Sequence, residues 1–358
     1  MRRIIFFILA ILAIFSIVGC AKSSKKFKVG FVYVGSINDG GWTQSHNEAR
    51  LELEKSIAEI ETTYVENVPE GLDAERVITT FAKKGYDLIY TTSFGFMDPT
   101  INVAKKFPNT IFMHCSGNKR ANNVGTYFGA MEEAKYLAGL IAGKMTKSNS
   151  IGFVLPHPIP EVVRLTNAFA IGVKEVNPDA KVKIVFTNSW FDPTKEKEAA
   201  IALIDSGVDV LATGCDSSAA ILAGEEREVW TIGYDSDASA IAPKTYLTSP
   251  IWNWIVIYKD IVDKAISKEI TNWSNFDYYE GLNTGIVGLA PLTNNVPDDV
   301  KELVYQRKND IENKEFVIFK GPLYKNDNTL ILDEGQSASH DELMSMDYFI
   351  DNIEGSLE

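Results

Sequence analysis

Aromatic residues occur in this sequence where an apolar stretch ends and a helix is expected to begin. In residues 185–200, VFTNSWFDPTKEKEAA, Trp190 and Phe191 end an apolar run, and Asp192 and Pro193 follow with the residue types preferred at a helix N-cap and at the first helical position. A ring in this place can stack on a flat ligand, or it can fill the core. For any single aromatic residue the sequence leaves both uses open.

Polar residues accompany aromatic ones after several other apolar runs, in INDGGW, TTSFGFMDP, GCDSS, GYDSD and TSPIWNW. A mostly apolar cleft with a few placed polar groups is typical of a small-molecule site. Two carboxylates have another use, because Asp39 can cap a helix that starts near Gly40 and Asp192 is expected to cap its own helix. The candidate ligand-binding residues at these positions are Asn38, Asp39, Trp42, Ser93, Phe94, Trp190, Asp216, Asp235 and Trp252.

Familiar catalytic and cofactor-binding patterns are missing from the sequence. It contains no G-x-x-x-x-G-K-[ST], G-x-G-x-x-G, H-E-x-x-H, C-x-x-C or G-x-S-x-G. The histidines, His46, His114, His157 and His340, have no metal-ligand spacing. We therefore expect a binding protein rather than an enzyme, with no cofactor and no metal.

The elements that must position these residues alternate between apolar runs and amphipathic segments. Most of the runs are continuous, which is typical of strands buried on both faces of a sheet. Alternation of strand and helix predicts parallel sheets with right-handed crossovers, which bind ligands at the carboxyl ends of their strands. The runs form two series, at residues 28–35, 62–68, 88–95, 110–117 and 124–130, and at residues 150–157, 182–189, 210–217, 229–237 and 245–252.

The two series predict an α/β protein with two doubly wound parallel-sheet domains. A polar stretch at residues 143–150 indicates the first crossing between them, and two more are expected near residues 248–250 and after a strand at 283–292. Three crossings would form a hinge beside a cleft that both sets of strand ends line. The expected bounds are residues 27–147 with 250–290, residues 148–249 with 291–335, and a C-terminal segment at 336–358, with a hairpin-like pair inside 316–332.

The first twenty residues, MRRIIFFILAILAIFSIVGC, have the pattern of a signal peptide, with Arg2 and Arg3 as its basic region. The apolar run at residues 4–17 is short for a membrane span, which needs about twenty residues. Because it ends in IVGC, which resembles a lipobox, we expect removal of residues 1–19, lipidation of Cys20 and a tether at residues 20–26. The alternative is an ordinary secretory signal followed by a chance cysteine.

The net charge of the chain argues against a nucleic-acid partner, and its remaining cysteines argue against a disulfide. The 358-residue chain has a formal net charge of −13, and loss of Arg2 and Arg3 with the signal peptide would make it −15. Nucleic-acid binding needs basic surface, so no nucleic-acid partner is expected. Cys115 and Cys215 each end an apolar run, which indicates buried thiols rather than a disulfide.

Several long motifs resemble the basic membrane protein (Bmp) family of lipoproteins. They span residues 27–353 and include VGFVYVGSINDGGW, YVENVPEG, TTSFGFMDPT, VAKKFPNTIFMHCSG, YLAGLIAGKM, NAFAIGVKEVNPDAKV, NSWFDPTKE, GYDSD and FKGPL. That family contains purine nucleoside receptors, so the resemblance implies a type I periplasmic binding fold, purine uptake through a partner ABC permease, and no chemistry. It also implies an extracytoplasmic protein that a lipid anchors to a bacterial membrane and that, by fold-level analogy, works as a monomer.

The segments ENVPEG, SFGFMDP and PIPEV are most similar to the nucleobase, adenine-type branch of that family. Nucleoside receptors carry an Asp where this chain has Tyr33 and a Lys where it has Trp252, and both help to hold the ribose. Their replacement favours a bare base such as adenine over a nucleoside. The same comparison makes Trp42 and Trp190 the aromatic pair that sandwiches the purine, with Phe191 facing the core.

Two alternative functions stay open at this level. A purine nucleoside receptor would keep the class of protein and change the ligand. A surface adhesin or sensor lipoprotein would use the same fold for contact with another protein. Because an adhesin has no need of paired aromatic residues that face into a cleft, the aromatic rim favours the receptor.

Overall fold

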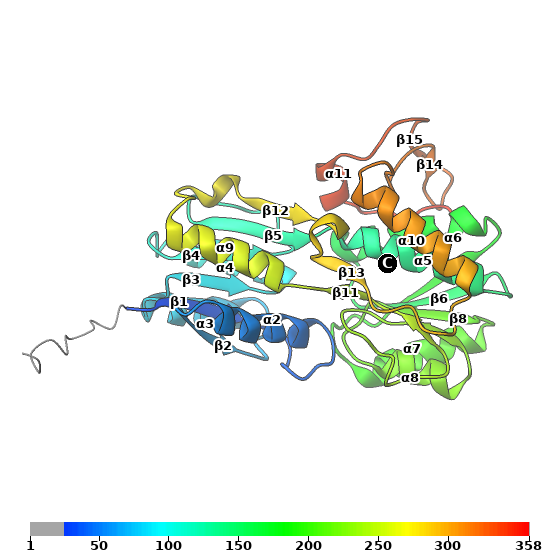
Figure 1. Ribbon diagram of the computed structural model, residues 1–358, viewed down its shortest axis with the longest axis horizontal. Coiled ribbons are helices and arrows are strands. Elements are labelled where there is room, and N and C mark those ends of the chain that lie inside the picture. Colours follow the sequence, from blue (N-terminus) through cyan, green and yellow to red (C-terminus); the bar gives the residue numbers. More distant parts are fainter. Residues whose placement is uncertain (1–24, 358) are drawn as a thin grey trace, which may run out of the picture.

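The structure, a computed structural model, describes residues 25–357. The expected signal peptide, the lipidation site Cys20 and most of the expected tether therefore lie outside the described residues. Figure 1 shows two α/β lobes side by side, joined by a narrower connection that contains β11 and β13. We call the lobe that holds β1 domain 1 and the lobe that holds β6 domain 2.

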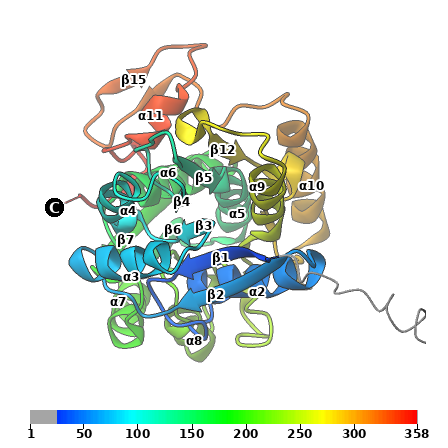
Figure 2. The same ribbon diagram turned by 90° about the vertical axis from the view of Figure 1, so that its left-hand side faces the viewer.

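A six-stranded parallel sheet forms the centre of domain 1. Helices flank it on both faces, with α2 against α9 and α3 against α4 (Figure 2). Across the sheet the strands are β12 (Asp277–Glu280), β5 (Val124–Gly129), β4 (Ile111–Cys115), β3 (Leu88–Thr91), β1 (Phe27–Val32) and β2 (Ile60–Val65). The helices are α2 (Trp42–Ser56), α3 (Leu72–Lys83), α4 (Met97–Ala104) and α9 (Ile255–Ser267).

Domain 2 repeats this architecture with a second six-stranded parallel sheet. The predicted pair of doubly wound domains is therefore confirmed. Its strands are β10 (Tyr246–Thr248), β9 (Trp230–Ile232), β8 (Val210–Thr213), β6 (Ser150–Leu155), β7 (Lys181–Phe186) and β16 (Ile353–Glu354). Its helices are α5 (Met131–Met145), α6 (Pro160–Val176), α7 (Pro193–Asp205), α8 (Ala219–Glu226) and α10 (Asp298–Glu312).

The chain changes domain at short irregular breaks. The strand predicted at residues 245–252 is two strands, because β10 ends before Ser249 and β11 (Pro250–Trp252) leaves sheet 2 to pair antiparallel with β13 (Val287–Leu289). Two 3₁₀ turns, Trp273–Asn275 and Leu282–Thr284, flank β12. The sequence analysis missed β12, since DYYE is a polar edge strand without the apolar run that marked the others.

The helix α5 corrects one expected domain bound. Residues 131–147 were expected in domain 1, but α5 packs along α6 in domain 2 (Figure 1). The two helices approach so closely that a Cβ at Gly139 would lie 2.0 Å from the carbonyl oxygen of Phe169. The first crossing therefore lies between β5 and α5, where no polar stretch marks it in the sequence.

The C-terminal region covers domain 2 and then joins its sheet. The short strands β14 (Leu323–Tyr324) and β15 (Leu330–Leu332) pair antiparallel, which confirms the predicted hairpin. The helix α11 (His340–Met344) packs on α6, and β16 pairs with the edge strand β7. Part of the expected separate segment at residues 336–358 is thus an edge of sheet 2.

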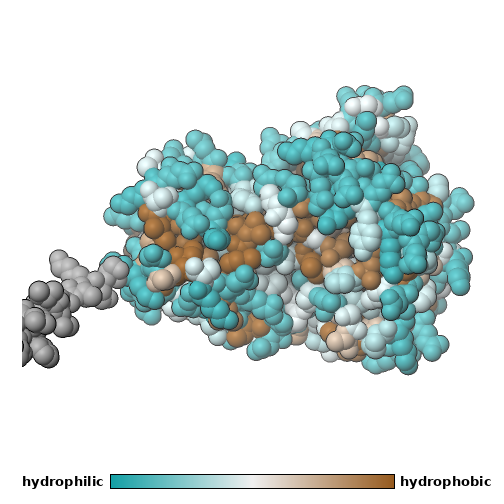
Figure 3. All heavy atoms as spheres, viewed as in Figure 1, coloured by the Kyte–Doolittle hydropathy of each residue, from teal (hydrophilic) through white to brown (hydrophobic). Residues whose placement is uncertain are grey.

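The surface shown in Figure 3 and the two described cysteines agree with the sequence analysis. On the face shown in Figure 3 hydrophilic residues predominate, with apolar patches on both lobes. Within residues 25–357 we find no helix that combines the length and the hydropathy needed to cross a membrane. Cys115 and Cys215 are free and buried, as predicted.

Candidate ligand-binding site

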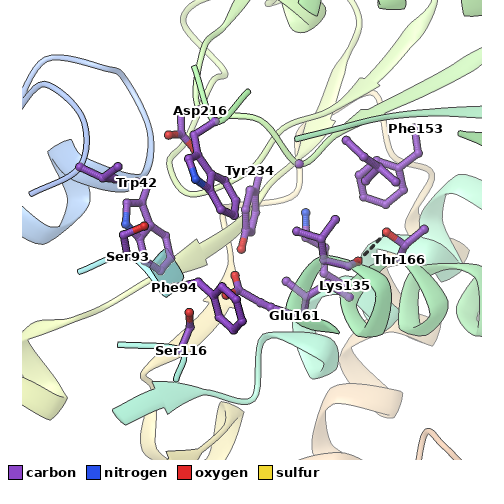
Figure 4. Close-up of a pocket in the computed structure, with 16 residues that line it drawn as sticks. Trp42, Ser93, Phe94, Ser116, Lys135, Phe153, Glu161, Thr166, Asp216 and Tyr234 are labelled. Atoms are coloured by element: carbon purple, nitrogen blue, oxygen red, sulfur yellow. Dashed lines mark hydrogen bonds between the residues drawn. The ribbon is translucent and has the colours of Figure 1, made fainter. Parts of the chain in front are cut away.

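A cavity lies at the carboxyl ends of the strands, with walls from both domains (Figure 4). The empty space within it is about 570 Å³. Apolar and aromatic side chains form much of the wall, and seven titratable or hydroxyl-bearing residues interrupt it. The lining residues are Val34, Trp42, Ser93, Phe94, Ser116, Lys135, Phe153, Leu155, Glu161, Val162, Leu165, Thr166, Trp190, Gly214, Asp216 and Tyr234.

Trp42 belongs to the domain 1 wall and opens the helix α2. Its Nε1–H donates to the carbonyl oxygen of Thr92 at 2.7 Å, which fixes the orientation of the indole. Trp252 and Trp254 meet it edge-on, with ring centroids 5.7 Å and 5.3 Å away. The hydrogen bond and the two neighbouring rings therefore fix Trp42 in the cavity wall.

Asp39 holds the start of α2 instead of facing the cavity. Its carboxylate accepts from the backbone N–H groups of Gly41, Thr43 and Gln44 at 2.8–3.0 Å. Anions favour helix N-termini, because unpaired N–H groups and the helix dipole converge there. The capping alternative for Asp39 is confirmed. Asn38 lies in the preceding turn, where its backbone N–H donates to Ser36, and it is absent from the cavity wall.

Trp190 belongs to the domain 2 wall and precedes α7. It meets the ring of His157 edge-on at 4.9 Å. Asp192 accepts from the backbone N–H of Lys195 at 3.1 Å, which confirms it as the cap of α7. The expectation that Phe191 faces the core is wrong, because its side chain is 47% exposed. The short cap loop turns consecutive side chains in different directions, so Trp190 reaches the cavity and Phe191 reaches solvent.

Ser93 and Phe94 line the cavity from the loop that follows β3. The hydroxyl of Ser93 donates to Glu70 at 2.5 Å, and its carbonyl oxygen lies 2.9 Å from Nε2 of His114. Phe94 begins a 3₁₀ turn, Phe94–Phe96. These bonds tie the loop to β4 and to the segment before α3, so the position of Phe94 is fixed.

Asp216 lines the cavity, whereas Asp235 is not one of the lining residues. Burial raises the pKa of Asp216 well above its ordinary value, and the nearby carboxylates of Asp235 and Asp39 raise it further. Burial also raises the pKa of Asp235, although Lys135 and a hydrogen bond from Trp252 oppose the shift. Neutral carboxyl groups can donate as well as accept hydrogen bonds.

Two residues that the resemblance placed at the ligand lie elsewhere. Tyr33 is fully buried in the core of domain 1, between the rings of Phe31 and Tyr64. Trp252 is 7% exposed, donates from Nε1 to Asp235 at 2.8 Å and stacks on Trp254. Neither belongs to the cavity wall. An aromatic side chain at these positions packs into the surrounding rings, so the polar contacts implied for a nucleoside receptor have no counterpart there.

The candidate residues chosen from the sequence do not include five polar residues of the wall, namely Ser116, Lys135, Glu161, Thr166 and Tyr234. Lys135 could have been found, because a lysine inside the apolar helix segment AKYLAGLIAG is unusual. Glu161 was visible only as a first-turn residue after PIP, a place where acidic residues commonly serve the helix dipole.

Aromatic and polar side chains share this cavity wall. Among the described residues no group of three or more His, Cys, Asp or Glu side chains could hold a metal ion. Aromatic walls can stack on a flat ring, and the polar groups can read its edge.

Comparison with known proteins shows the family and the functional class of this chain. The family model for PnrA-like ABC transporter substrate-binding proteins, Bmp, matches residues 26–327. The chain belongs to the Bmp family. Members of this family are substrate-binding receptors of ABC transporters rather than enzymes, and such receptors act outside the cytoplasm.

Two similar proteins differ in the ligand that their names print. A purine-binding protein of Brucella abortus (strain 2308) is 41% identical over 351 residues, which cover 98% of this chain and 99% of the relative. A protein of Haloferax volcanii is named as a candidate glucose-binding protein of an ABC transporter. It is 36% identical over 341 residues, which cover 95% of this chain and 83% of the relative.

Solved structures support the fold of this Bmp protein. A solute-binding protein of an ABC transporter system from Aeropyrum pernix K1 superposes with a TM-score of 0.71 at 19% identity, over 88% of this chain and 95% of that chain. At this identity the likeness shows the fold alone.

Proposed function

We propose that this Bmp-family receptor binds a purine base, adenine in the first place, in the cavity between its domains and delivers it to an ABC permease. The observation that carries the proposal is the pair of tryptophans on the wall, Trp42 from domain 1 and Trp190 from domain 2. A planar ring between two such side chains would be buried on both faces, and each base–aromatic stack contributes roughly 1–3 kcal/mol. The name of the Brucella relative supports a purine ligand.

A base is favoured over a nucleoside by what surrounds Tyr33 and Trp252. In nucleoside receptors of the family the corresponding Asp and Lys help to hold ribose, but here both side chains are packed among other rings. A ribose would gain no partner from them, and unpaired buried hydroxyl groups cost about 1–3 kcal/mol each. Closure of the two domains about the three crossings would complete the site.

The anchor belongs to the same proposal. Lipid at Cys20 and a tether at residues 20–26 would hold the receptor, as a monomer, at the outer side of the bacterial cell membrane, within reach of the permease. Mass spectrometry of the protein from membranes tests this point, since lipidation predicts an acylated Cys20 as the first residue. A protein that begins at another residue without lipid would contradict it.

The decisive experiment is calorimetric titration of residues 21–358 after unfolding and refolding, which removes carried-over ligand. The ligands are adenine, guanine, hypoxanthine, adenosine, guanosine and glucose. We expect adenine to bind most tightly and glucose not to bind. Equal or tighter binding of nucleosides would contradict the base preference and leave the receptor class intact, whereas binding of glucose alone would overturn the purine proposal.

A matched pair of neighbours tests the stacking role. Trp190→Ala should weaken adenine binding roughly 5- to 150-fold, which corresponds to the loss of one stack. Phe191→Ala is the control, because this adjacent ring is 47% exposed and lies outside the cavity wall. It should change the affinity less than two-fold. Equal losses from both substitutions would mean that the loop, rather than the indole, matters.

A further inference from the structure

Three polar side chains of domain 2 meet at the inner end of the cavity. They come from separate elements: Lys135 from α5, Glu161 from the first turn of α6 and Tyr234 from the loop after β9. In Figure 4 all three reach into the cavity, and the hydroxyl end of Tyr234 lies toward Glu161. The Nζ of Lys135 stands 3.5 Å from the centre of the Tyr234 ring.

The hydrogen-bonding capacity of this group is largely unused. The Tyr234 hydroxyl is buried and has no hydrogen-bond partner among the described residues. Lys135 is 2% exposed, and the bond that it makes within residues 25–357 is long, at 3.4 Å to the carbonyl oxygen of Thr213. An ammonium group carries three donors, and buried donors without partners are costly.

Glu161 supplies an acceptor beside these donors. Burial raises the pKa of its carboxyl group, while Arg164 and a hydrogen bond from Ser116 oppose the shift. Two donors and one acceptor thus face a cavity whose remaining inner wall is apolar, with Phe153, Leu155 and Leu165. Such a set has the form of a site that a ligand edge completes.

We propose that Tyr234, Lys135 and Glu161 recognise the hydrogen-bonding edge of the ligand and so determine which heterocycle binds. The matching chemistry is a ring nitrogen acceptor next to an exocyclic N–H donor, as in a 6-aminopurine. Tyr234 and Lys135 donate to ring nitrogens, and Glu161 accepts from the amine. This inference rests on the proposed purine-binding function and adds the residues that would set its specificity.

The unpaired hydroxyl of Tyr234 gives a signature that a structural role would not produce. Removal of an unsatisfied buried group relieves its desolvation cost in the empty protein. Tyr234→Phe should therefore leave the melting temperature of the ligand-free protein unchanged or raise it. Lys135 also contacts Thr213, the Tyr234 ring and Asp235, so Lys135→Met is assessed by its affinity alone. Both substitutions should weaken adenine binding roughly 5- to 100-fold, because the ligand loses a donor.

The test combines thermal unfolding without ligand and calorimetric titration with adenine and with unsubstituted purine, on residues 21–358. The wild type should prefer adenine by at least about 10-fold, and Glu161→Met, which removes the acceptor and keeps a side chain of similar length, should remove most of this preference. Thr100→Val is the matched control, because Thr100 is buried outside the cavity wall and its hydroxyl likewise donates to a carbonyl oxygen four residues earlier, that of Phe96, at 2.7 Å. Its affinity for adenine should stay within about two-fold of the wild type.

The outcomes separate this inference from the proposed function. If the wild type binds adenine but all three variants keep its affinity and its preference over purine, the inference is overturned and the purine receptor stands. If Tyr234→Phe lowers the melting temperature together with the affinity, its role is structural and the inference is also overturned. If the wild type binds no purine, the proposed function fails and the inference falls with it.

Discussion

The indole of Trp252 holds a buried carboxylate and supports a neighbouring ring. Its Nε1–H donates to Oδ1 of Asp235, while Oδ2 of Asp235 has no partner among the described residues. The ring also meets Trp42 edge-on and stacks on Trp254 at 4.2 Å. Trp252 is thus a positioning residue for the wall rather than part of the wall.

Trp252→Phe should lower the free energy of unfolding by about 1–3 kcal/mol, because it leaves both oxygens of a buried carboxylate without a donor. Urea unfolding of the ligand-free protein measures the change. Trp254→Phe is the control, since its Nε1–H makes a longer bond of 3.2 Å to the neutral hydroxyl of Ser45. We expect a smaller loss of about 1 kcal/mol there. Equal losses would show that ring packing, not the carboxylate, sets the effect.

At the scale of elements, each tryptophan of the proposed clamp stands beside a helix start that an aspartate caps. Asp39 caps α2, which begins at Trp42, and Asp192 caps α7, which begins three residues after Trp190. The cap fixes the angle at which the chain enters the helix, and with it the position of the nearby ring. A similar capped helix start in each domain therefore places one tryptophan on the wall of the same cavity.

Asp39→Ala should cost about 1–2 kcal/mol of stability, since three N–H groups of α2 lose their acceptor. The affinity for adenine should fall as well, because Trp42 is the first residue of that helix. Thermal unfolding and titration on the same sample measure both effects.

Asp39→Asn serves as the control for that substitution. Asn keeps an acceptor oxygen and caps helices about as well as Asp. It should lose less stability and affinity than Asp39→Ala, because its oxygen can still accept from Gly41 and Gln44, whereas its NH2 group replaces Oδ2, the acceptor for Thr43. A loss as large as that of Asp39→Ala would show that the charge of Asp39, rather than the cap geometry, is required.

At the scale of the whole molecule, the stability of the fold is coupled to pH through buried groups. Burial lowers the pKa of His114 from 6.5 to about 4 and lowers that of His46 well below its ordinary value. At pH values between the folded-state pKa and the ordinary pKa of a histidine, the unfolded chain binds a proton that the folded protein does not bind. These histidines therefore lower the free energy of unfolding as the pH falls. Asp216 and Asp235 act in the opposite sense, because their pKa values are raised.

His114→Gln isolates the contribution of one histidine. The difference in unfolding free energy between the wild type and this variant should shift by about 3 kcal/mol, against the wild type, as the pH falls from 7 to 4. Gln can keep a donor for the carbonyl oxygen of Ser93, which lies 2.9 Å from the imidazole. Urea unfolding at several pH values measures this difference. A constant difference would mean that His114 titrates normally in the folded protein.

Local signals in the sequence determined the elements and their caps. Continuous apolar runs predicted the strands of both sheets, and Asp192 before Pro193 predicted the start of α7, because strand burial and helix capping depend on neighbours along the chain. The carboxyl-end rule also brought Trp42, Ser93, Phe94, Trp190 and Asp216 to one edge, where the structure places them on a common cavity wall.

Only the tertiary structure decided which side chains face that cavity. A strand buried on both faces has no alternation of polar and apolar residues, so its sequence does not say whether Tyr33 points to the core or to the cleft. Lys135 and Glu161 lie on one wall because α5 belongs to domain 2 and packs on α6. Gly139, Gly143 and Gly172 permit this contact, and no local sequence pattern predicts it. Neighbours along the chain fix the elements, whereas the inner end of the cavity depends on how distant elements pack.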